Sequence, residues 1–267
     1  MAAPADLYTL IAGGRFSETW RLLESGSHLP GPRANLALLL QFVDALDRHR
    51  TEDLRAELIR WLATPIIDAP VNTPAEFPVA CAAAALSCWI GAATTRAVDA
   101  LVGAAHDNRW RTREGVVLGL QRTAERRPDP VIKLTAAWGT SQDPFLERAA
   151  LATLGHAPLL KSPANALLGL DLTSAVIDRL QSLPQAHQKT EGNRILTQTL
   201  AYVVSMFVAA QPETGFARLE QWLMRADKST RRIINENLGK ARLTRPFAVE
   251  VARLKGIEFE INDWDRH

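Results

Sequence analysis

Apolar residues recur at helical spacing along almost the whole chain, and this pattern limits the fold more than any other feature. Residues Leu36, Leu39, Val43 and Leu46 show the three- and four-residue steps that place apolar side chains on one helix face. Similar stripes lie within residues 54–62, 172–183, 196–207, 216–223, 234–241 and 247–254. Strand-like alternation is almost absent. We therefore predict an all-α protein made of about a dozen short helices.

Prolines divide these stripes at short and regular intervals. Proline is favoured in the first turn of a helix, where its missing N–H has no intrahelical partner, and a preceding Ser, Thr, Asp or Gly strengthens the signal. The sequence therefore predicts that helices begin near each such proline. These prolines are Pro32, Pro65, Pro74, Pro128, Pro130, Pro144, Pro163 and Pro212.

Two segments share one pattern, in which an Asp is followed by a bulky apolar residue, an Arg and then small and apolar residues. They begin at Asp107 and Asp143, and their arginines Arg113 and Arg148 lie 35 residues apart. Looser matches follow at Arg194 and Arg231. A spacing of roughly 35 to 47 residues is typical of HEAT-like helix pairs, which stack into a superhelix.

This spacing predicts one HEAT-like α-solenoid over residues 1–267. Residues 1–69 form atypical capping helices in this interpretation, residues 70–255 form the repeats, and residues 256–267 form an acidic tail. We expect the Asp that opens each matching segment to cap the second helix of a pair.

The composition is that of an ordinary globular protein. Apolar residues make up 47% of the chain and charged residues 22%, which excludes disorder, collagen and a membrane bundle. The uncharged segment 77–95 is rich in alanine, so we predict a helix buried on several sides, not a membrane span. The N-terminus has no basic segment followed by an apolar stretch, and a cytoplasmic location is expected.

No motif for a metal, a nucleotide or a nucleophile is found. Cys81 and Cys88 are expected to lie about two helical turns apart, too far for a disulfide, as small buried residues. The six histidines show no ligand spacing, and no Gly-rich phosphate loop occurs. We expect no metal site and no cofactor.

The segment from Asp107 to Leu118 resembles the AlkC/AlkD-type DNA alkylation-repair glycosylases, in which a helix opens with Asp, Trp and Arg and then turns apolar. The resemblance extends in patches from Ala105 to Arg245 and implies a HEAT-like fold and DNA as partner. In that family, paired tryptophans and acidic residues precede the matching helix. Here one tryptophan, Trp89, precedes it, with no carboxylate before Asp99. The family's catalytic acid therefore has no counterpart.

Basic residues gather near the C-terminus, although the net charge of the chain is only +2. From Asp227 to Lys255 there are eight basic and three acidic residues. In a solenoid the second helices line the inner face, so their arginines are candidates to bind phosphates in a row. The alternative is that each arginine pairs with an acidic residue of a neighbouring repeat. The candidate binding residues are Arg109, Trp110, Arg113, Arg148, Arg194, Lys228, Arg231, Arg232, Arg242 and Arg245.

Trp110 differs from the other tryptophans because it lies in the first turn of its helix among arginines, a setting that suits an interface as well as an N-terminal staple. Trp61, Trp138 and Trp222 follow apolar stripes and are expected in the core.

These observations favour a non-catalytic binding module that holds duplex DNA by its backbone along a concave basic face. Two alternatives remain open: a DNA N-glycosylase that excises alkylated bases, and a protein-interaction scaffold without a nucleic-acid role.

Overall fold

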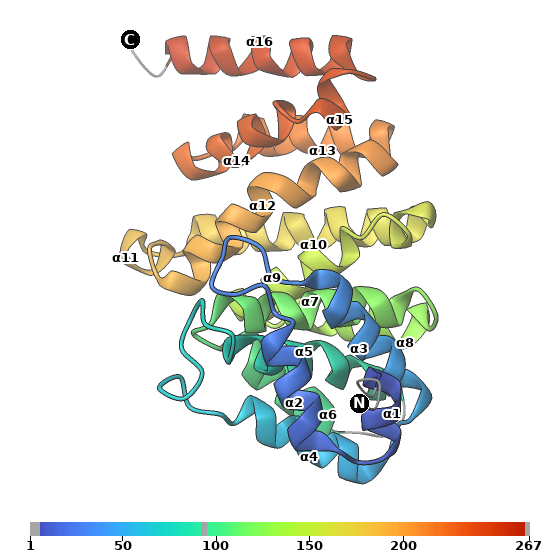
Figure 1. Ribbon diagram of the computed structural model, residues 1–267. Coiled ribbons are helices and arrows are strands. Elements are labelled where there is room, and N and C mark those ends of the chain that lie inside the picture. The colour runs from blue at the N-terminus through green and yellow to red at the C-terminus, as the bar shows by residue number, and fades with distance from the viewer. Residues whose placement is uncertain (1–5, 92–94, 265–267) are drawn as a thin grey trace. The chain divides into compact units, whose positions relative to one another are not determined.

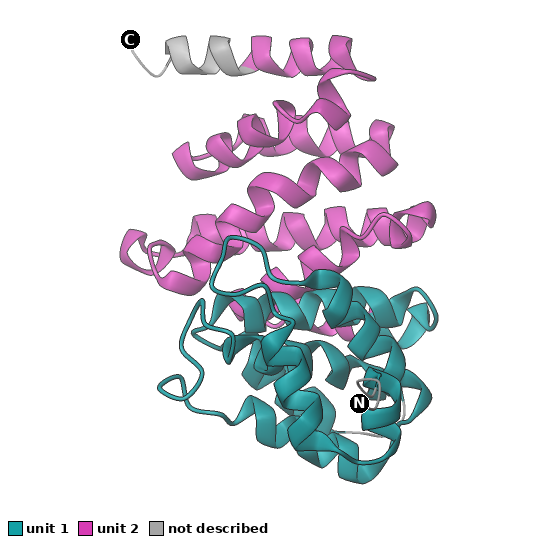
Figure 2. Cartoon of the chain, viewed as in Figure 1, with its two compact units in different colours: residues 1–131 teal, residues 132–267 magenta. Residues whose placement is uncertain are grey.

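The computed structural model describes residues 6–91 and 95–264, with side chains described as far as residue 257. All regular structure in this part of the chain is helical, as predicted. The chain divides into two compact units, residues 1–131 and 132–267 (Figure 2). No helix of the described residues is both long and apolar enough to cross a membrane.

Unit 1 is built around one buried helix. Its helices are α1 (Leu7–Ala12), α2 (Phe16–Ser25), α3 (Leu36–Arg48), α4 (Glu52–Leu62), α5 (Glu76–Ala85), α6 (Thr95–Ala105) and α7 (Trp110–Ala124), with the 3-10 helix η1 (Leu86–Trp89) after α5. All ten residues of α5 are buried, and the helix packs against α2, α3, α4, α6 and α7. This confirms the prediction of a helix buried on several sides. The described part of segment 77–95 is not one helix, however, because α5 ends at Ala85 and η1 follows.

The contact between α5 and α7 is unusually close because two glycines of α7 face the backbone of α5. A Cβ atom at Gly115 would lie 2.4 Å from the Ala80 carbonyl oxygen, and one at Gly119 would lie 2.0 Å from that of Ala84. The alanine-rich sequence of α5 therefore permits close helix packing on several sides at once.

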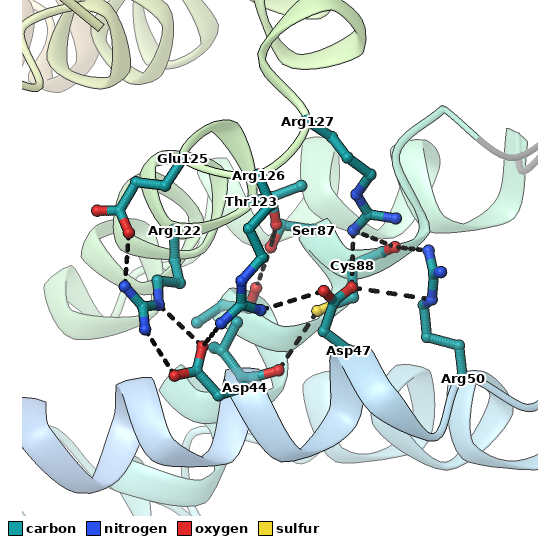
Figure 3. Close-up of polar contacts among 12 residues, drawn as sticks. Asp44, Asp47, Arg50, Ser87, Cys88, Arg122, Thr123, Glu125, Arg126 and Arg127 are labelled. Carbon is teal, nitrogen blue, oxygen red and sulfur yellow. Dashed lines mark hydrogen bonds and ion pairs between the residues drawn. The ribbon is translucent and has the colours of Figure 1, made fainter. Parts of the chain in front are cut away.

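A network of ion pairs joins α3 to the end of α7 (Figure 3). Arg122 binds Asp44 through two hydrogen bonds of 2.8 and 2.7 Å, and Arg126 bridges Asp44 and Asp47. Arg127 also binds Asp47, at 2.8 Å. The hydrogen bond from Arg122 holds the pKa of Asp44 below its usual value.

The backbone of η1 takes part in the same network. The carbonyl oxygen of Cys88 accepts hydrogen bonds from Arg50 and Arg127, each 3.0 Å long (Figure 3). Beside it, the hydroxyl groups of Ser87 and Thr123 are buried and lie 2.8 Å apart. The network therefore satisfies polar groups that the end of α5 would otherwise leave buried without partners.

Both cysteines are free and buried, as predicted. Burial raises the pKa of the Cys81 thiol well above its ordinary value. Burial also raises the pKa of Cys88 to about 12, and the nearby Asp47 carboxylate contributes to that shift. Neither thiol therefore ionises near neutral pH.

Unit 2 is a succession of helices, each packed against the next ones along the chain (Figure 1). Helix α8 (Pro128–Gly139) begins in unit 1 and ends in unit 2. The others are α9 (Pro144–Leu154), α10 (Pro163–Ser182), α11 (Gln185–Gln188), α12 (Glu191–Ala210), α13 (Pro212–Met224), α14 (Lys228–Leu238), α15 (Ala241–Thr244) and α16 (Ala248–Trp264), with the 3-10 helix η2 (Leu159–Lys161) before α10. Helix α12 packs against α9, α10, α13 and α14, and is the central helix of the unit.

Pro128, Pro144, Pro163 and Pro212 each begin a helix, as predicted. Pro32, Pro65 and Pro74 do not, because they lie in turns that precede α3 and α5. Helices α10 and α12 are 20 residues long, so the prediction of uniformly short helices was wrong for both. The predicted stripe at 234–241 is divided between α14 and α15, because α14 ends at Leu238.

The proposed caps are observed in unit 2. Asp143 accepts hydrogen bonds from the backbone of Phe145 and Leu146 at the start of α9, and Asp227 accepts one from Thr230 in α14. In unit 1 the N-cap of α7 is Arg109, and Asp107 binds its backbone N–H at 2.7 Å. Helix α16 continues through Trp264, so the segment predicted as an acidic tail is helical from residue 256 to 264, and its side chains from residue 258 lie outside the described part.

Candidate nucleic-acid interface

Arg109 and Arg113, in unit 1, are buried and hold the turn that enters α7. Arg109 is 3% exposed and pairs with Asp107 at 2.6 Å, while its other guanidinium nitrogen binds the Thr64 carbonyl oxygen at 3.1 Å. Arg113 is 9% exposed and donates to the Asp107 carbonyl oxygen at 2.6 Å. These contacts give both arginines a structural role at the turn before α7.

Trp110 is the first residue of α7, and its side chain is 48% exposed. Trp61, Trp138 and Trp222 are buried, as predicted. Of these four tryptophans, Trp110 is the exposed one.

In unit 2, several ion pairs between helices that pack together use arginines that were not candidates. Arg179 of α10 pairs with the buried Glu147 of α9, Arg218 of α13 binds Asp171 of α10 at 2.9 Å, and Arg253 of α16 binds Glu220 of α13 at 2.8 Å. A further pair joins Arg225 to Asp178 at 2.8 Å. These four arginines are all distinct from the candidate binding residues.

Two candidate residues line one pocket between α12 and α14. The pocket has a volume of about 570 Å³. Arg194 of α12 and Arg232 of α14 both line it, together with Lys189, which follows α11. The remaining lining residues are Gln188, Thr197, Gln198, Ala201, Ser229, Ile233 and Glu236. We call this surface the α12–α14 groove.

The cations of the α12–α14 groove are largely uncompensated. Arg194 and Lys189 form no ion pair or side-chain hydrogen bond with any residue whose side chain the structure describes. Arg232 binds Glu236, one turn further along α14, at 2.9 Å, in an exposed pair of small energetic value. Three cations thus face one carboxylate, and the groove has a positive potential that favours anions.

Beyond the pocket, a second group of cations surrounds Tyr202 of α12, four residues after Gln198. Its ring is half exposed. The Arg242 guanidinium carbon lies 4.7 Å from the ring centroid, and the Lys240 ammonium lies 5.9 Å from it. These cation–π contacts orient both basic side chains over the ring without neutralising them.

The remaining candidates of unit 2 do not line the groove. Lys228 and Arg245 are exposed, and neither forms an ion pair with a described side chain. Arg148 and Arg231 are partly buried and engaged in contacts of their own. The structure therefore brings the candidates Arg194 and Arg232 together with Lys189, which was not a candidate. Separately, it places the candidate Arg242 at the Tyr202 ring with Lys240.

Two hydrogen bonds of one buried side chain hold together the helices on either side of this groove. Asn237 of α14 is fully buried, donates to the Leu200 carbonyl oxygen at 2.8 Å and accepts from the Ser205 N–H at 2.8 Å. Both partners belong to the backbone of α12. A single amide therefore fixes α14 against α12 in both position and direction.

Among the side chains that the structure describes, no group of three or more His, Cys, Asp or Glu residues could hold a metal ion. In comparisons with protein-family models, curated proteins and solved structures, the chain matches none.

Proposed function

We propose that this protein is a non-catalytic, HEAT-like repeat module that binds duplex DNA through its phosphates along the α12–α14 groove. The observation that supports this function best is the convergence of Lys189, Arg194 and Arg232 in one pocket, two of them without an acidic partner. Arginine and lysine at such a surface bind a phosphate backbone and release its counterions.

The HEAT-like arrangement is supported by the order of packing in unit 2, where α9, α10, α12, α13 and α14 contact their neighbours along the chain. The Arg–acid pairs between these helices supply the structural contacts, and the basic groove is left for a ligand. Resemblance to the alkylation-repair glycosylases adds DNA as the expected polyanion.

The test is a titration of a short fluorescent DNA duplex with the full chain at several salt concentrations. The variant Lys189→Gln with Arg194→Gln removes two cations that pair with no described residue, so the fold should be unaffected. We expect weaker binding to every duplex sequence and a salt dependence reduced by roughly one phosphate contact per removed cation.

The matched control is Lys133→Gln with Lys161→Gln, which removes the same charge at exposed positions that do not line the groove. Equal loss of binding in the control would show general charge attraction and contradict the site. No binding at low salt would contradict DNA as ligand and favour the protein scaffold. Release of a base from an alkylated duplex in a parallel reaction would favour the glycosylase.

A further inference from the structure

A second pocket, in unit 1, has a different chemistry. It has a volume of about 470 Å³ and lies among α3, α5 and α7 and the loop before α3. Eight of its eleven lining residues are apolar: Pro32, Ala34, Leu36, Leu39, Phe77, Ala80, Trp110 and Leu118. The other three are Arg33, Arg111 and Glu114. A volume of roughly 300–1,000 Å³ with mainly apolar walls and a few polar groups is typical of a small-molecule site.

Two large apolar side chains are left half exposed at this pocket. Leu36 is 50% exposed and Trp110 is 48% exposed. Exposed apolar surface is unfavourable in water, and covering it releases free energy in proportion to the apolar area removed from water. A ligand with an apolar body would gain that energy by covering both side chains.

The wall of the pocket is held in place before any ligand arrives. Arg111 is 6% exposed, pairs with the fully buried Glu76 at 3.0 Å, and donates to the Gly31 carbonyl oxygen at 2.9 Å. Its guanidinium carbon lies 4.4 Å from the Trp110 ring centroid. The loop before α3 and the Trp110 ring are therefore anchored to one buried ion pair.

The same anchor extends to the loop before α5. The Asn72 side-chain oxygen accepts from both Arg111 and the Gly31 N–H, each at 3.2 Å, and the Asn72 N–H binds Glu76 at 2.7 Å. A preorganised wall lowers the entropic cost of binding, because the protein does not have to be ordered by the ligand.

The charge at the pocket indicates the polar end of the ligand. Arg33 lines the pocket, is exposed, and has no ion pair or hydrogen bond with any described side chain. Arg111 is already neutralised by Glu76, and Glu114, the other carboxylate at the pocket, is engaged in an interaction of its own. The uncompensated charge is thus the Arg33 guanidinium, which forms paired hydrogen bonds with a carboxylate.

We infer that this pocket binds a small amphipathic carboxylate, whose apolar chain or ring lies against Leu36, Phe77 and Trp110 and whose carboxylate pairs with Arg33. The site is independent of the DNA proposal, because it lies entirely in unit 1 and shares no residue with the α12–α14 groove.

The experiment is a titration of the ¹⁵N-labelled full chain with octanoate, observed at the indole N–H signals of its seven tryptophans. The variant Trp110→Phe assigns the Trp110 signal. We expect a saturable shift of that signal, with the buried tryptophans little changed. Octanoate binding that leaves the Trp110 signal in place would overturn the site, as would the lack of any saturable shift.

The carboxylate contact is tested with Arg33→Gln and with the uncharged 1-octanol. We expect Arg33→Gln to weaken octanoate binding about threefold to fivefold, as for an exposed ion pair, and to leave octanol binding unchanged. The control Arg48→Gln removes an exposed arginine of α3 that does not line the pocket, and should leave both affinities unchanged. Equal octanoate binding by wild type and Arg33→Gln would overturn the assignment of the anionic end.

Discussion

At the scale of single residues, buried polar groups decide more of this structure than exposed charges do. Two buried side chains, those of Asn237 and Arg111, donate hydrogen bonds to backbone carbonyl oxygens. The carbonyl oxygen of the buried Cys88 accepts hydrogen bonds from arginines. Each such group would cost roughly 1–3 kcal/mol if it were buried without a partner. Their positions therefore restrict which helices can be neighbours.

Replacing Asn237 with Leu should destabilise the protein by about 2–4 kcal/mol, because the Ser205 N–H and Leu200 carbonyl lose a buried partner. Chemical denaturation would measure the loss. The control Gln221→Leu changes an exposed amide of α13 and should shift the midpoint little. A change of under about 0.5 kcal/mol in Asn237→Leu would show that the amide does not join α12 to α14.

The Cys88 thiol should make stability fall in alkaline solution. Its pKa is raised from 9.0 to about 12 in the folded chain, so the folded state holds a proton that the unfolded state has lost. The free energy of unfolding should therefore decrease as pH rises above about 9 toward 12. Cys88→Ala should flatten this decrease relative to wild type in denaturation curves measured at successive pH values.

Thiol labelling tests the burial of Cys81 and Cys88 independently of pH-dependent stability. Both cysteines should react with an aromatic disulfide reagent at least about a hundredfold more slowly in the native chain than in denaturant, because burial suppresses the thiolate. Rapid labelling of one thiol per native chain at pH 8 would contradict the burial of that cysteine.

At the scale of elements, two helices can approach closely where a glycine of one helix faces the backbone of the other. Gly119 of α7 faces the Ala84 carbonyl oxygen of α5, whereas a Cβ at Gly103 of α6 would meet nothing within 4 Å. The two positions therefore form a matched pair, each a glycine inside a helix of unit 1.

Gly119→Ala should destabilise the protein by about 2 kcal/mol or more, because α5 and α7 would have to separate. Gly103→Ala should stabilise it by about 0.5–1 kcal/mol, because alanine is the better helix former. Thermal and chemical unfolding of the two variants would measure both changes. Similar effects of the two substitutions would show that α5 and α7 do not pack at the distance described.

At the scale of the whole molecule, each unit has a central helix that its neighbours cover. In unit 1 this is α5, with every residue buried, and in unit 2 it is α12, which contributes Leu196, Leu200 and Phe207 to the core. Helices near the surface, such as α11, bury none of their residues.

Amide hydrogen exchange should therefore be slowest in α5 and α12 and much faster in α11, because exchange of the central helices requires opening of a whole unit. Peptide-level mass spectrometry would measure these rates. Exchange in α5 as fast as in α11 would contradict the central position of α5.

Most helices of this protein follow from local sequence signals, because apolar spacing and proline position act within one or two helical turns. The stripes at 36–46 and 196–207 lie in α3 and α12, and four prolines begin helices where predicted. The burial of Cys81, Cys88 and the alanine-rich segment was predicted from the lack of charge and the alanine content of this stretch, and it is confirmed. Local signals failed at the break between α14 and α15, and in the lengths of α10 and α12.

The exposure of each charged side chain, in contrast, depends on how the helices pack. Sequence placed Arg109, Arg113, Arg194 and Arg232 in one set, but burial and partner choice depend on residues distant in the chain. Arg109 binds the Thr64 carbonyl oxygen, whereas Arg194 and Arg232 line one pocket from two different helices. The unit 1 pocket likewise joins Arg33, Phe77 and Trp110 from three separate segments. Helical periodicity shows which face of a single helix is apolar, but it does not show which helices become neighbours. Sites of this kind form only when several helices pack together.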